Sequence, residues 1–224
     1  MRNKFDEQLS LLNHEMIEMG ALCEEVIALS SQALTEGDTA LASKVAPLDS
    51  EIDHKERDIE SQCMKLLLRQ QPVAKDLREI SAALKMISDL ERIGDQASDI
   101  AELARFIRKG GAHSHLKQMA AEVIRMVSES VDAFVRLDLD QAREVIAYDD
   151  VVDRWFDQIK KELVSQIAAD SANPGAISQY VDYLMIAKYL ERMSDHATNL
   201  AEWVEYALTG TRSKDGHWEA PDGE

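Results

Sequence analysis

Leu90 to Glu102 reads LERIGDQASDIAE, and Leu190 to Glu202 reads LERMSDHATNLAE. Seven of these thirteen positions are identical, and the second segment follows the first at an offset of 100 residues. A repeat at a fixed period indicates that one structural unit occurs twice in the chain. Around both segments, apolar residues recur every three to four positions, which predicts amphipathic α-helices.

The composition favours the same fold class. Aromatic residues make up only 5% of the 224 residues, and there are 9 Gly and 4 Pro. No run of about 18 apolar residues is present, so we expect no membrane insertion. The N-terminus has no apolar signal segment, and two isolated cysteines fit a reduced, cytoplasmic setting. A formal charge of −17 argues against nucleic acid as a partner and favours cations or a basic protein surface.

Breaks in the apolar pattern divide the chain into six predicted helices. Glycine or proline residues mark four of the five turns between them, and the capping residue Asp138 marks the other. The helices are expected at residues 5–35, 38–70 and 75–108, then at 112–136, 138–170 and 176–209. The prediction is an all-α fold of two tandem, pseudo-symmetric, antiparallel three-helix bundles. The expected units are residues 1–109 and 112–209, followed by a polar tail at 210–224.

Acidic residues recur at four-residue steps in both repeats, and residues four apart share one face of a helix. The repeated acids are Asp49, Asp53, Glu91, Asp95 and Asp99 in the first copy, and Asp149, Asp153, Glu191 and Asp195 in the second. Such clusters can be solvated, become protonated, pair with arginine or bind a cation. Arg92 is expected to point about 100° away from Glu91 and so to leave it unpaired. Oxygen-rich sites suit Mg, Mn, Ca or Fe.

Other motifs are weaker evidence for a functional site. Glu51-x-x-His54 matches the spacing of di-iron bundles, but the chain has no second ExxH to complete such a site. His113 and His115 are expected in a solvated linker between the repeats. The chain contains no Walker A, GxSxG or GxGxxG motif, so we expect no catalytic residues and no enzyme. The alternative from the residues is a carboxylate-bridged metalloprotein that stores or oxidises iron.

The duplicated segment resembles the paired signatures of the PhoU family, the accessory and regulatory proteins of the phosphate-specific transport system. Three further stretches are similar to family sequences: MIEMGALCEEVI (16–27), RQQPVAKDLREI (69–80) and VRLDLDQAREVIAYDDVVD (135–153). The resemblance extends from about Phe5 to Tyr206. It implies two pseudo-symmetric three-helix bundles, in agreement with the repeat.

The resemblance also implies metal clusters bound by an acid-x-x-x-Asp motif. The first cluster would use Asp49, Asp53, Glu91, Asp95 and Asp99, and the second Asp149, Asp153, Glu191 and Asp195. The metal would be a divalent or iron-type ion, Fe, Mn, Mg, Zn or Ca. Because Asn199 replaces the acid found at Asp99, we expect weaker or fewer metals in the second cluster.

The function implied by the resemblance is regulatory. Family members repress the phosphate-starvation response when phosphate is sufficient, and they restrain phosphate uptake. They are thought to link the ATPase subunit of the phosphate transporter to a phosphate-sensing histidine kinase, and they commonly form homodimers. A long acidic helical surface without a nucleophile is consistent with such a scaffold.

Overall fold

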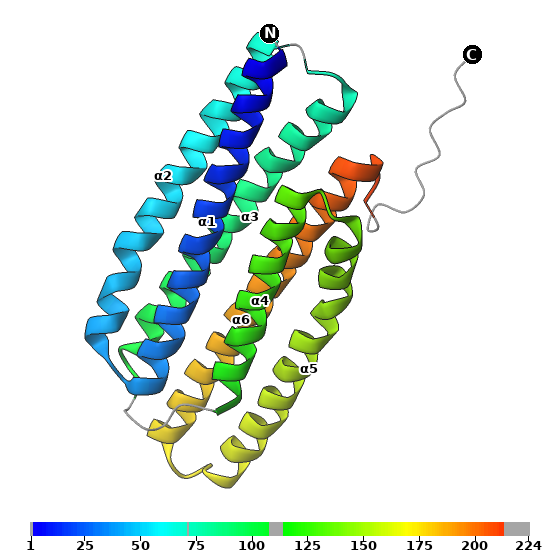
Figure 1. Cartoon of the computed structure of the whole chain (residues 1–224). Helices are drawn as coiled ribbons and strands as arrows, with labels where there is room; N and C mark the ends of the chain where they lie inside the picture. Colours follow the sequence, from blue (N-terminus) through cyan, green and yellow to red (C-terminus); the bar gives the residue numbers. More distant parts are fainter. Residues whose placement is uncertain (1, 71, 108–113, 213–224) are drawn as a thin grey trace.

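The computed structural model describes residues 2–70, 72–107 and 114–212, and every regular element in these ranges is an α-helix. The first three helices form one bundle and the last three form another (Figure 1). The helices are α1 (Arg2–Glu36), α2 (Thr39–Gln70), α3 (Ala74–Ala104), α4 (Ser114–Arg136), α5 (Leu139–Ala169) and α6 (Pro174–Thr209). The predicted all-α fold of two three-helix bundles is therefore confirmed.

The same kind of turn joins the first two helices of each bundle. Asp38 caps α2 by accepting a hydrogen bond from the backbone N–H of Ala40 at 2.8 Å, and Asp138 caps α5 by accepting one from Gln141 at 3.0 Å. The residue before each cap has a positive φ, 62° at Gly37 and 55° at Leu137. The turn keeps its geometry in the second copy although a leucine occupies the glycine position there.

The two bundles pack side by side through two antiparallel helix pairs, α3 with α6 and α1 with α4 (Figure 1). The helices α2 and α5 lie on the outer flanks. Buried apolar residues of all six helices form one continuous core, in which Phe134, Leu12 and Ile186 are fully buried. The repeats are thus two halves of one packed body, and α3 and α6 lie next to each other at its centre.

Several local expectations need correction. The helix α3 ends at Ala104, where a tighter turn begins, and does not extend to residue 108. His115 is not in a solvated linker: it lies on α4, with Nδ1 3.2 Å from Glu162 Oε2 and its ring beside Trp155. The first residues of the expected polar tail fold back, and Arg212 pairs with Glu202. The predicted boundary near residues 109–112, His113 and most of the tail (213–224) lie outside the described residues.

Candidate metal sites

The first acidic site is centred on Asp49, which α2 directs against α3. Its Oδ1 atom is buried. Gly94 makes room for it, because a Cβ at that position would lie 2.9 Å from this oxygen. Burial raises the pKa of Asp49, the charges of Asp95, Asp53 and Asp99 add to the rise, and the nearby Ser98 hydroxyl opposes it. The structure therefore places Asp49 of α2 near the acids Asp95 and Asp99 of α3.

Arg92 pairs with two outer acids of this site, Glu91 and Asp95. Arg92 Nη1 donates to Asp95 Oδ2 at 2.9 Å, and Arg92 Nε lies 3.4 Å from Glu91 Oε2. The expectation that Arg92 points away from Glu91 is therefore wrong, because its long side chain bends back along the helix. Burial raises the pKa of Glu91, and Asp95 raises it further while Arg92 lowers it. A cation at this site would have to compete with Arg92.

The second site repeats this arrangement around Asp149. Burial raises the pKa of Asp149 to about 6, with further increases from Asp153 and Asp195. Burial also raises the pKa of Asp153 and of Asp195, and in both cases the charge of Glu191 adds to the rise. Lys188 pairs with Glu191, as Arg92 pairs with the acids of the first copy. The Oδ1 atom of Asp149 is again buried.

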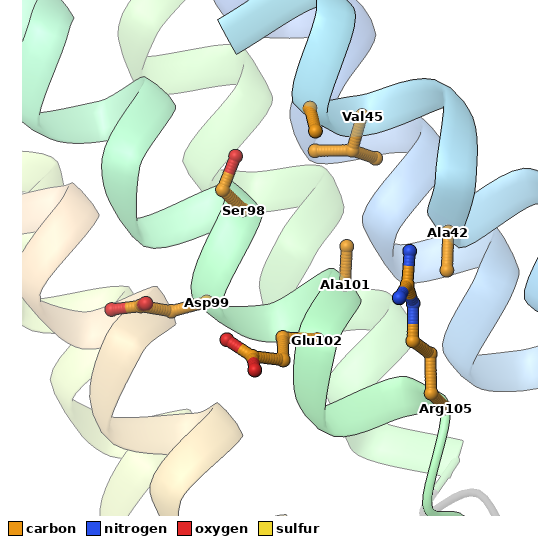
Figure 2. A pocket seen from close by; sticks show the side chains of 8 residues that line it. Ala42, Val45, Ser98, Asp99, Ala101, Glu102 and Arg105 are labelled. Carbon is orange, nitrogen blue, oxygen red and sulfur yellow. The ribbon is translucent and has the colours of Figure 1, made fainter.

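The free space near the two sites differs. A hollow of about 410 Å³ at the second site is lined by Asp149, Arg192, Asp195, His196, Thr198 and Asn199. In the first copy, the hollow of about 260 Å³ lies between α2 and α3 toward the end of α3, and its lining includes Ser98, Asp99, Glu102 and Arg105 (Figure 2). Asp49 and Asp95 do not line that hollow. The second hollow opens onto the predicted ligands Asp149 and Asp195, whereas Asp99 is the predicted ligand that lines the first.

Asp99 and Asn199 both face the seam between α3 and α6. Figure 2 shows Asp99 pointing away from α2. It interacts with the Tyr189 hydroxyl, whose pKa is raised by burial and then by Asp99. Asn199 Nδ2 donates to Asp89 Oδ1 at 3.3 Å, and His196 Nδ1 lies 2.8 Å from the same oxygen. Asp99 is therefore shared between the first acidic site and the interface with α6.

The donor chemistry of both sites fits a hard cation. Each offers several carboxylates, including one with a buried oxygen. Within the described ranges, however, no three His, Cys, Asp or Glu side chains are already arranged so that they could hold a metal ion. Metal binding would therefore require the outer acids to turn away from Arg92 and Lys188 and toward the half-buried Asp49 and Asp149. The predicted ligand set stays a prediction.

Two kinds of residue at these sites were missed by the sequence reasoning. The hydroxyls of Ser98 and Thr198 lie beside the central aspartates, and Gly94 provides the space for Asp49. The matched pair Ser98 and Thr198 within the repeated segment was the available signal. The ExxH motif takes no part in either site, because His54 Nδ1 contacts the Ser50 carbonyl of its own helix at 2.5 Å.

No helix in the described part of the chain is long and apolar enough to cross a membrane. The family profile described as "PhoU domain" matches the chain twice, at residues 16–104 and 116–204. Each match contains one copy of the acidic motifs.

Individual proteins agree with this match. The chain is 37% identical over 212 residues to the phosphate-specific transport system accessory protein PhoU homolog of Pseudomonas aeruginosa, covering 93% of this chain and 86% of that protein. The homolog from a Synechocystis species is 36% identical, with 94% of both chains covered.

Solved structures show the same fold. The crystal structure of PhoU from Pseudomonas aeruginosa aligns with a TM-score of 0.85 at 37% identity, over 92% of this chain and 100% of that one. The phosphate transport system regulatory protein PhoU from Streptococcus pneumoniae also aligns at 0.85, with 27% identity, over 93% and 98% of the two chains. The duplicated profile, the curated relatives and the shared architecture together place this chain in the PhoU family.

Proposed function

We propose that this protein is a cytoplasmic accessory regulator of phosphate-specific transport. In this role it represses the phosphate-starvation response when phosphate is sufficient and restrains phosphate uptake. It does so as an adaptor between the ATPase subunit of the phosphate transporter and a phosphate-sensing histidine kinase. The observation that carries the proposal is the match along nearly the whole chain to relatives named as accessory proteins of that system.

The surface chemistry supports an adaptor. The chain carries a formal charge of −17, and its acidic motifs lie on α2, α3, α5 and α6, so both copies present carboxylates. The central α3 and α6 are held together by Asp89, His196 and Asn199, which favours a rigid body. Large apolar side chains such as Leu68 and Phe106 are 79% and 74% exposed. Such side chains provide contact area for a partner or for a second copy in a homodimer.

Metal ions form part of the proposal. The acids Asp49, Asp53, Glu91, Asp95 and Asp99 would hold one cluster, and Asp149, Asp153, Glu191 and Asp195 the other. A bound divalent or iron-type cation supplies positive charge that offsets the repulsion among the carboxylates. The half-buried Asp49 and Asp149 then provide the inner ligands, while the outer acids exchange Arg92 and Lys188 for the metal. A protein at −17 needs such charge if it is to attract phosphate.

The decisive experiment is deletion of the gene in the source organism, with a reporter of phosphate-starvation genes. Deletion should switch the reporter on in high phosphate, and the wild-type gene should switch it off again. A reporter that stays silent after deletion would contradict the regulatory role. Purified protein that oxidises ferrous iron with turnover, lost in Asp95→Ala, would instead favour the alternative of iron storage or oxidation.

A further inference from the structure

The second repeat binds an arginine of its own chain. Arg212 lies just beyond α6, where its guanidinium pairs with Glu202 and lies over the ring of Trp203, 4.1 Å from the ring centroid. Only 14% of the Arg212 side chain and 7% of the Glu202 side chain are exposed. A carboxylate next to an aromatic face is a favourable environment for a guanidinium. The second repeat therefore contains an arginine site that is occupied.

The first repeat has the same glutamate without an arginine. Glu102 is the equivalent of Glu202, since both close the repeated segment and their numbers differ by 100. The Glu102 side chain is exposed, and among the described residues no basic side chain pairs with it. The carboxylate that binds arginine in one copy is thus available in the other.

Glu102 lines the hollow of about 260 Å³ between α2 and α3 (Figure 2). The apolar part of its wall consists of the small side chains Ala42, Val45, Ala46 and Ala101. An arginine side chain combines an apolar stem with a charged head, so it matches a hollow with both kinds of wall. Pockets for organic ligands usually exceed about 300 Å³, so this hollow suits a single side chain better than a cofactor.

The charges around this hollow leave one carboxylate without a counterion. Asp99 and Glu102 contribute two negative charges, and Arg105 contributes one positive charge. Arg105 is directed toward α2, because its Nη2 atom lies 3.4 Å from Ser43 Oγ. One further positive charge would balance the hollow.

In the second repeat that charge is present. Arg143 Nε lies 3.2 Å from Glu205 Oε1, so these two residues neutralise each other. Glu202 is then the remaining carboxylate, and Arg212 pairs with it. The same surplus of one negative charge is therefore neutralised by an arginine in one copy and left open in the other.

We propose that the hollow at Glu102 is the docking position for an arginine side chain of a partner protein. The proposal rests on the adaptor part of the proposed function and specifies the partner surface as an arginine next to apolar residues. Phe106 directly follows Arg105 and is 74% exposed, so an aromatic side chain is available for those apolar residues. The formal charge of −17 attracts such a basic surface. Glu102 is not one of the predicted metal ligands, so this position differs from the carboxylate clusters.

The test is an NMR titration of the full chain with the capped peptide GLRLG in chelator-treated buffer. The peptide should shift the amide signals around Glu102, and replacing its arginine with neutral citrulline should abolish these shifts. Glu102→Gln should weaken peptide binding about tenfold, because a hydrogen-bonded charge pair is lost. Glu60→Gln is the matched control: it removes the same charge from an exposed position about 20 Å along α2 from Ala46, and it should leave the affinity unchanged.

Arg212→Ala tests the comparison between the copies. Removal of Arg212 should open the site at Glu202, so this variant should bind the peptide at two positions. The double variant Arg212→Ala with Glu102→Gln should keep only the position at Glu202. Binding at Glu202 in Arg212→Ala, without shifts around Glu102 in the wild type, would overturn the proposal. Equal shifts with the citrulline peptide would overturn it as well.

Capture on the immobilised full chain identifies the source of the arginine. The probes are the purified ATPase subunit of the phosphate transporter and the cytoplasmic part of the histidine kinase. Glu102→Arg should abolish capture of one of them, and Glu60→Arg should not. Unchanged capture by Glu102→Arg, or self-association of the chain that this variant abolishes, would overturn the partner assignment and leave the adaptor role standing. A wild-type chain that captures neither protein would overturn both.

Discussion

The two repeats differ at a few positions where they meet, along the seam between α3 and α6. Because these helices are antiparallel, a position in one copy does not face its own equivalent in the other. Asp89 faces His196 and Asn199, whereas their equivalents bring Tyr189 to Asp99. Each contact places a hydrogen-bond donor from α6 against a carboxylate of α3.

This comparison gives Asn199 a second explanation. Asn199 replaces the acid of the first copy, and from the sequence alone it was interpreted as a weaker metal ligand. In the structure its amide donates to Asp89, which a carboxylate at this position would repel. The difference between the repeats at this position therefore stabilises the interface between them, independently of its effect on metal binding.

The free space at the two acidic sites opposes the prediction that the second site binds metal more weakly. The first copy has the additional acid Asp99, which favours tighter binding there. The second copy has the larger hollow, directly beside Asp149 and Asp195. The additional charge therefore favours tighter metal binding at the first site, whereas the free space favours it at the second. The predicted order of metal affinity stays a prediction.

The largest change in stability is expected from Asn199→Asp. The new carboxylate would lie about as close to Asp89 as the present amide, in a partly buried seam, and should destabilise the protein by about 2 kcal/mol at pH 7. For a chain of this size the melting temperature should fall by roughly 5 °C. Thermal unfolding in chelator-treated buffer measures this fall in melting temperature.

The matched variant in the other copy is Asp99→Asn. Here the Tyr189 hydroxyl can donate to the amide oxygen, so the loss should stay below about 0.5 kcal/mol. Equal losses in the two variants would show that the seam contacts do not explain the difference between the repeats.

A smaller effect of opposite sign is expected from Asp149→Asn in metal-free protein. The pKa of Asp149 is raised from 3.8 to about 6 in the folded state, so the folded protein keeps this proton where the unfolded chain has lost it. Stability therefore falls as the pH rises through this window. At pH 7 the variant should be more stable by roughly 1–2 kcal/mol, and the difference should vanish below about pH 4.

Denaturant unfolding at several pH values measures this gain. Asp49→Asn is the counterpart in the first copy, and it should shift stability in the same direction, because burial also raises the pKa of Asp49. Saturating Mn²⁺ should reverse the sign for Asp149→Asn, since the wild type alone would gain the binding energy. A variant that is less stable than wild type at pH 7 without metal would contradict this account.

The smallest effects concern the basic side chains that neutralise the acids. Arg92→Ala at the first site and Lys188→Ala at the second each remove a competitor for the carboxylates. Exposed ion pairs contribute about 0.2–1 kcal/mol, so each change should raise Mn²⁺ affinity at its own site up to about fivefold. Arg136→Ala is the control, because its exposed pair with Asp132 lies on α4. A gain equal to that of the control would mean that Arg92 and Lys188 do not compete with metal.

Much of the architecture was predictable because its signals are local. Apolar residues at three- and four-residue steps predicted the helices, and Asp38 and Asp138 predicted two of the starts. The same spacing placed the acids of both copies on shared helix faces. The predictions failed where the contact depends on the path of a long side chain or of a chain end. Arg92 lies against Glu91, and Arg212 pairs with Glu202.

The six helices and the acidic motifs follow from the sequence alone, because periodicity and capping act between residues near one another in the chain, and the repeat predicts their grouping into two related bundles. The antiparallel pairing of α3 with α6 within a single core is visible only in the folded structure. That pairing set Asp89 against Asn199, and the packing of the second helix on the third set Asp149 beside Thr198. Such contacts depend on helix orientation and side-chain direction, which no spacing within one helix specifies.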